Sequence, residues 1–259
     1  MKNVAPVYCI LVCSLFALFS CTKNTEDVNA ALIQNKAGSR LLNASNVAII
    51  DYMPGDSLVV KGDTSNGDET VLLHSGYGGI SRPDFPSFTA LSNGFGGIDG
   101  RDRSIMKFKL RGINDSLRNN PPQIQKAVLY LYQYHRPADK DPYTIAQNGD
   151  NSVELHRVVG DWEPGTINWS NQPTLARGSA NPLEDVVIIP PVVTPLPAGT
   201  NDDQVVDVTD MVRKIITAGN YKGFLLKLTR QGEFSYFGRA YGSFTCPIES
   251  KRPKLILYF

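Results

Sequence analysis

Apolar and polar residues alternate along much of this chain, which is the pattern of β-strands that bury one side. In Ser104–Leu110, Met106 and Phe108 fall on one side of such a strand, and Lys107 and Lys109 fall on the other. We therefore expect a strand here, with an apolar side in the core and a basic side outside it.

A second segment, Ala127–Tyr134, alternates in the same way but carries large or apolar residues on both sides. One side consists of Ala127, Leu129 and Leu131, and the other of Val128, Tyr130, Tyr132 and Tyr134. A strand that already buries an aliphatic side has no structural need for three tyrosines opposite it. That second side is therefore either covered by a loop or open to a ligand, and tyrosine offers a flat ring and a hydroxyl to a sugar.

Eight further segments are short and rich in β-branched and aromatic residues, with Gly, Pro, Asn and Asp between them. They are Val47–Asp51, Ser57–Lys61, Thr70–His74, Ser152–Val159, Gln204–Val208, Phe224–Thr229, Phe234–Phe237 and Lys254–Phe259. This composition predicts an all-β fold, a sandwich or a barrel. We expect one core, formed by Met106, Phe108, Leu129, Leu131, Val153, Leu155, Phe224, Leu226 and Leu257.

One helix and two long loops interrupt the strands. Asp207–Asn220 has an apolar stripe at helical spacing, with Thr209 as the expected N-cap and Gly219 as the stop. The segments Tyr77–Asp102 and Arg177–Asp203 are expected to be long loops, although the middle of the second is too apolar for a solvated linker.

The N-terminal residues are expected to form a targeting segment and not to belong to the folded domain. The apolar run Pro6–Phe19 reads as a secretory segment, too short for a transmembrane helix, and Leu18–Cys21 resembles a bacterial lipobox. We expect residues 1–20 to be a lipoprotein signal peptide that is cut before a lipidated Cys21. The alternative is an ordinary signal peptide in which Cys21 is incidental.

Residues 21–42 are then expected to form a tether, and residues 43–259 the folded domain. Glu26 and Asp27 resemble the acidic export signal of surface lipoproteins. We expect an outer-membrane lipoprotein, exposed on the surface of a Bacteroidetes-type bacterium and held to the membrane by its lipid anchor only.

The charge composition argues against a nucleic-acid-binding protein. The formal charge is +1 over 259 residues, so no general basic field favours nucleic acid. Positive charge is nevertheless concentrated in residues 101–111, at Arg101, Arg103, Lys107, Lys109 and Arg111. If this strand lies beside the Tyr130–Tyr134 strand in one sheet, one surface would combine aromatic rings with cations for acidic sugars.

Several blocks in fixed order resemble the DNRLRE domain, a bacterial family grouped with carbohydrate-binding modules. They are the strands at 103–110 and 125–132, the block 153–173 with Asp161-Trp162 and Trp169, the pair 206–212 and 220–224, and Arg252-Pro253-Lys254-Leu255. The resemblance implies a jelly-roll-like antiparallel β-sandwich without catalytic activity. In some members of the family it implies binding to acidic polysaccharide such as alginate.

Residues that carry catalysis or bind metal are scarce. The chain has three histidines, His74, His135 and His156, without metal-ligand spacing. Asp161 and Glu163 could in principle act on a sugar, but a structural turn is the better interpretation. Residues 62–69 are rich in oxygen ligands, so structural calcium is the alternative there to a solvated turn. We expect no cofactor and no enzyme activity.

Two functions from different classes remain. The first is a noncatalytic, surface-anchored module that binds carbohydrate, with Tyr130, Tyr132, Tyr134, Arg103, Lys107 and Lys109 as the candidate binding residues. The second is a structural or adhesive surface protein that binds protein partners. Trp162 and Trp169 could also stack on sugars, but we expect them to cap the core.

Overall fold

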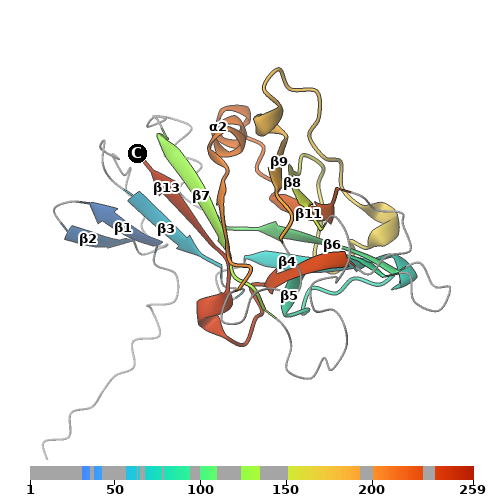
Figure 1. The fold of residues 1–259 in the computed structure, drawn as a ribbon. Coiled ribbons are helices and arrows are strands. Elements are labelled where there is room, and N and C mark those ends of the chain that lie inside the picture. The colour runs from blue at the N-terminus through green and yellow to red at the C-terminus, as the bar shows by residue number, and fades with distance from the viewer. Residues whose placement is uncertain are drawn as a thin grey trace, which may run out of the picture.

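The computed structural model describes residues 31–35, 38–42, 57–62, 64, 68–77, 79–93, 100–109, 124–134, 151–192, 201–229 and 237–259. In this part of the chain the fold consists of two antiparallel sheets and one short α-helix (Figure 1). The all-β prediction with one short helix is thereby confirmed. None of the helices in these ranges is long and apolar enough to span a membrane.

The six-stranded sheet contains the Tyr130 strand. Its spatial order is β10 (Gln204–Asp207), β7 (Lys126–Leu131), β13 (Lys254–Tyr258), β3 (Ser57–Lys61), β1 (Ala31–Asn35) and β2 (Gly38–Leu42). Strands β3, β7, β10 and β13 match predicted segments. The hairpin β1–β2 lies within the predicted tether and extends this sheet beside β3, while Cys21 and the predicted strand Val47–Asp51 lie outside the described residues.

The seven-stranded sheet contains the Arg103 strand. Its order is β12 (Phe237–Gly242), β5 (Ser87–Asn93), β6 (Gly100–Lys107), β11 (Phe224–Leu228), β8 (Val153–Arg157) and β9 (Val186–Ile189), with β4 (Glu69–His74) also paired to β6. Strands β4, β6, β8 and β11 were expected from the sequence. The predicted strand Phe234–Phe237 meets β12 at Phe237, and its other residues are not described.

Two strands lie where long loops were predicted, and both departures have a physical reason. In β5 both sides are buried, so small hydroxyl residues replace the polar half of the usual alternation. The hydroxyl of Ser104 donates to the carbonyl of Thr89 at 2.9 Å and accepts from its N–H at 2.7 Å. Strand β9 is a short apolar edge strand paired with β8, which explains why this stretch was too apolar for a linker.

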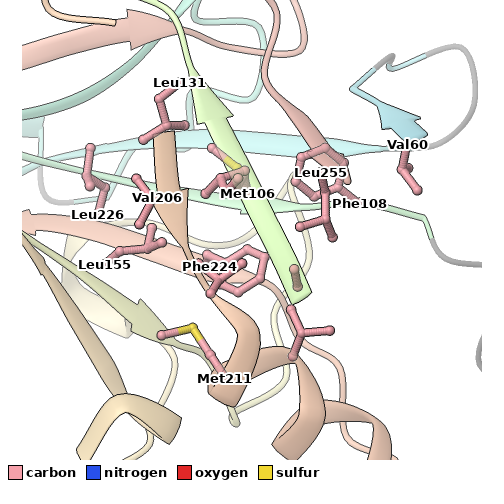
Figure 2. Close-up of a cluster of buried hydrophobic side chains, with 14 of the residues drawn as sticks. Val60, Met106, Phe108, Leu131, Leu155, Val206, Met211, Phe224, Leu226 and Leu255 are labelled. Atoms are coloured by element: carbon pink, nitrogen blue, oxygen red, sulfur yellow. The ribbon is translucent and has the colours of Figure 1, made fainter. Parts of the chain in front are cut away.

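The main core lies between the two sheets. Side chains from both sheets and from the helix meet there, among them Met106, Leu131, Met211 and Phe224 (Figure 2). All nine residues predicted for the core belong to this cluster. The alternation of apolar residues therefore identified which side of each strand faces inward.

Helix α2 (Thr209–Ala218) lies at one end of the two sheets, near β7 and β9 (Figure 1). Gly219 ends it in a left-handed conformation with φ 61°, as expected. The predicted N-cap is wrong, because Thr209 is the first helical residue and its N–H is bound by Asp207 at 2.9 Å. The Thr209 hydroxyl instead accepts a hydrogen bond from the N–H of Ala127 on β7 at 3.0 Å.

Candidate functional site

The outward side of the six-stranded sheet carries the aromatic residues that the sequence singled out. On β13, Leu255 and Leu257 are fully buried, so Lys254 and Tyr258 point away from the core. The register places Lys254 beside Tyr130 of β7. We call the surface formed by Tyr130, Tyr132, Lys254 and Tyr258 the Tyr face.

The rings of the Tyr face are arranged as a platform. Tyr130 and Tyr132 have ring centroids 6.4 Å apart and planes inclined by only 19°. The Lys254 ammonium lies 4.5 Å from the Tyr130 centroid and 5.7 Å from that of Tyr132. Burial and the neighbouring Tyr130 raise the pKa of Tyr258, so Tyr258 presents an uncharged ring and hydroxyl at neutral pH.

Tyr134 does not belong to this platform, although alternation placed it there. Strand β7 ends at Leu131, and Gln133 then bridges to Tyr241 of the other sheet. The Tyr134 N–H donates to the carbonyl of Ala240 on β12 at 3.2 Å. Because the chain changes sheets here, the alternation is interrupted, and Tyr134 is buried with 5% of its surface exposed.

The predicted cations are also absent from the Tyr face. Arg103 and Lys107 lie on β6, and Lys109 follows its end, so all three belong to the seven-stranded sheet. The strand that carries them is not a neighbour of β7. The single surface of tyrosines with Arg103, Lys107 and Lys109, which was conditional on such a pairing, is not formed.

Arg103 and Lys107 already have partners on their own sheet. The Arg103 guanidinium stacks on the Trp169 ring at 4.6 Å and donates to Gln172 at 2.8 Å. The Lys107 ammonium pairs with Glu69 at 3.3 Å and lies 5.7 Å from the Trp162 ring centroid. These cations hold a loop on the sheet.

That loop, residues 158–175, contains both tryptophans and is closed by a bridge between Val158 and Leu175. It covers a second apolar cluster on the outside of the seven-stranded sheet, formed by Val71, Leu73, Ile105, Val158, Trp162, Ile167 and Leu225. Trp162 is buried and donates its indole N–H to the carbonyl of Lys222 at 2.6 Å. The tryptophans were expected to cap the core; they cover this second cluster on the outside of the sheet instead of the main core.

Asp161 and Glu163 both lie in this loop, and each takes part in its local structure, Asp161 through its carboxylate and Glu163 through its backbone carbonyl. Asp161 is exposed and forms an ion pair with Lys222. The hydrogen bond that the Lys222 ammonium donates in this pair lowers the pKa of Asp161. The Glu163 carbonyl accepts from the N–H groups of Thr166 and Ile167, at 3.1 and 2.9 Å, in a tight turn. The arrangement agrees with a structural turn.

Two histidines of the described chain each contact one carboxylate. His74 contacts Asp102 at 2.5 Å, and His156 contacts Glu154 at 2.7 Å. Within the described ranges no three His, Cys, Asp or Glu side chains form a group that could hold a metal ion. His135 and half of the oxygen-rich stretch 62–69, namely residues 63 and 65–67, fall outside those ranges. Asp68 in that stretch accepts from the N–H of Lys109.

An open groove of about 740 Å³ lies where the edge strands β9 and β10 approach helix α2. Three exposed aliphatic side chains line it, Leu183, Ile188 and Val205, with exposed fractions of 52, 52 and 67%. No local sequence pattern indicates this groove, because it depends on two strand edges that meet only in the fold. Lys254 was not among the predicted site residues, although the alternation in 254–258 puts it on the same side of the strand as Tyr258.

Comparisons with known proteins add no relative. No protein-family model matches the chain, and no curated protein matches it either. The resemblance to the DNRLRE domain therefore stays a prediction from the motifs of the sequence.

Proposed function

We propose that this protein is a noncatalytic, lipid-anchored surface module that binds carbohydrate through the Tyr face, acidic polysaccharide included. The proposal includes a jelly-roll-like β-sandwich of the DNRLRE type for its two sheets, with Cys21 as the lipidated residue. One observation carries it: Tyr130 and Tyr132 form a nearly parallel pair of rings on the outward side of a sheet whose other side is already buried. Such rings stack on the apolar faces of sugars, and their hydroxyls bind the rims.

A glycan array probed with the purified full chain, with and without calcium, tests this proposal. We expect saturable binding to a restricted set of glycans. Tyr132→Ala should weaken that binding about tenfold, the loss of roughly 1.4 kcal/mol that one stacking contact supplies. Trp169→Ala is the matched control, because it removes an aromatic ring from the loop that covers the other sheet. Thermal unfolding verifies that each variant is folded.

The second candidate is a structural or adhesive surface protein that binds protein partners. The observation that favours it is the groove beside β9 and β10 with its exposed Leu183, Ile188 and Val205, since exposed aliphatic groups of this kind occur at protein interfaces. The two candidates give different results on the array. An absence of glycan binding at low salt would reject the carbohydrate module and leave the adhesive protein.

A further inference from the structure

Two lysines lie side by side next to the tyrosines. In the register of the six-stranded sheet, Lys254 is the direct partner of Lys61 on β3 and of Tyr130 on β7. Lys61 is exposed and Lys254 is partly exposed. Like charges directly opposite each other on neighbouring strands repel, so this pair costs stability in the empty protein.

Five other lysines of the described chain differ from this pair because carboxylates neutralise them, whereas Lys109 and Lys126 form no ion pair among the described residues and have no lysine directly opposite them on a neighbouring strand. Ion pairs with Asp or Glu are formed by Lys107, Lys214, Lys222, Lys227 and Lys251. No ion pair among the described residues includes Lys61 or Lys254. A repulsive pair without a counter-charge, placed beside an aromatic platform, suits an anionic group supplied from outside.

Lys254 also covers the platform. Its ammonium lies over the Tyr130 ring at 4.5 Å and near the Tyr132 ring at 5.7 Å. A sugar that stacks on these rings must first displace this cation. A neutral sugar offers the displaced ammonium only hydroxyl acceptors, whereas an anionic sugar gives it an ion pair and also relieves its repulsion with Lys61.

We propose that Lys254 is the specificity-determining residue of the Tyr face. This inference rests on the proposed function: Lys254 shields the rings in the empty protein and pairs with an anionic group of the glycan in the complex, with Lys61 as the second cation. The selected ligand class is a glycan chain that carries carboxylate or sulfate groups. Neutral chains of the same shape are disfavoured because they must displace Lys254 without forming an ion pair.

The test compares each anionic polymer with an uncharged polymer of the same sugar backbone, and it uses the full chain. Alginate is compared with its propylene glycol ester, polygalacturonate with its methyl ester, and dextran sulfate with dextran. The first two pairs report on carboxylate and the third on sulfate. The variants are Lys254→Gln and, as the control, Lys109→Gln, which removes the same charge from the end of β6 in the other sheet.

For the wild type we expect tighter binding to at least one anionic polymer than to its neutral counterpart. Lys254→Gln should lower that preference at least tenfold, reduce the dependence of binding on salt, and leave affinity for the neutral polymer equal or higher. Lys109→Gln should stay within twofold of the wild type. Unfolding midpoints are measured for both variants, and because Lys254 is partly exposed we expect a folded protein.

The outcomes separate this inference from the function on which it rests. Anionic binding that is equal in Lys254→Gln and Lys109→Gln would overturn the role of Lys254 and leave the carbohydrate module standing. Equal wild-type affinity for charged and neutral polymers would also overturn it. An absence of binding to every polymer and to the glycan array would reject the carbohydrate function itself.

Discussion

At the scale of single residues, the most buried charge of the described chain belongs to Arg239. Its guanidinium has no exposed surface and donates to Asp202 at 2.7 Å and to the carbonyl of Pro190 at 2.7 Å. The Tyr241 hydroxyl donates to Asp202 at 3.2 Å. This group joins β12 to the residues directly before β10, and thus links the two sheets.

Replacement of Arg239 should therefore be costly. We expect Arg239→Met to lower the free energy of unfolding by about 3–5 kcal/mol, because Asp202 would remain buried without its counter-charge. Urea unfolding monitored by tryptophan fluorescence measures the loss. Asp202→Asn in the Arg239→Met background is the control and should recover part of it, and an equal loss in single and double variants would contradict the explanation.

A second residue, His156, should make stability depend on pH. Its Nδ1 is buried without a hydrogen-bond partner in the described structure. Burial lowers the pKa of His156, although the hydrogen bond to Glu154 acts in the opposite direction. Since the folded pKa lies below the unfolded value of about 6.5, the unfolded state takes up protons first, and stability present above pH 6.5 falls as the pH is lowered below it.

We expect His156→Gln to reduce this loss of stability. The variant should lose less free energy of unfolding between pH 7 and pH 5 than the wild type, because it removes a group whose protonation is disfavoured in the folded state. Urea unfolding of both proteins at the two pH values gives the comparison. Equal losses would show that His156 does not contribute to the acid sensitivity.

At the scale of elements, β7 contributes fully buried side chains to the main core, so a truncation on this strand should lower the stability of the fold. Leu129 is fully buried in the main core, and its strand β7 lies between β10 and β13 in the sheet. Leu129→Ala should cost about 2–5 kcal/mol, since it leaves a cavity that its neighbours fill only in part. Val205→Ala on the adjacent β10 is the control and should change stability by less than about 0.5 kcal/mol, because Val205 is 67% exposed. Urea unfolding at pH 7 measures both.

Strands with one buried and one solvated side were predictable from the sequence. Met106 and Phe108 alternate with Lys107 and Lys109, and the structure buries the first two. Strand β5 was missed because both of its sides are buried, with Thr89 and Ser92 among the buried residues, so it lacks the polar half of the pattern. Alternation is a local signal and fails where tertiary packing covers the second side.

The candidate site was predictable only in part, because strand pairing depends on contacts far apart in sequence. Tyr130 and Tyr132 were found from the pattern of their own strand. Their neighbour Lys254 comes from the C-terminal strand, and no local pattern places it beside Tyr130. Arg103 could share this surface only if its strand paired with the Tyr130 strand, which the sequence could not decide. The structure places Arg103 on the other sheet.

At the scale of the whole molecule, the outward sides of the two sheets differ in charge balance. The seven-stranded sheet is capped by residues 158–175, and cations there are matched by carboxylates such as Glu69 and Glu154. The six-stranded sheet carries the Tyr face and the Lys61–Lys254 pair without acidic partners among the described residues. A chain with a formal charge of +1 can thus hold a local positive surface without a global field.

The predicted anchor that would hold the proposed carbohydrate-binding domain at the membrane is Cys21. The apolar run 6–19 ends directly before Ser20 and Cys21, and two or more acyl chains on one residue give stable membrane attachment. We expect Cys21→Ala to abolish labelling by a fatty-acid probe in the native host and to move the protein to the soluble fraction. Cys13→Ala, within the segment that we expect to be removed, should label normally. Unchanged membrane retention of Cys21→Ala would reject the lipid anchor.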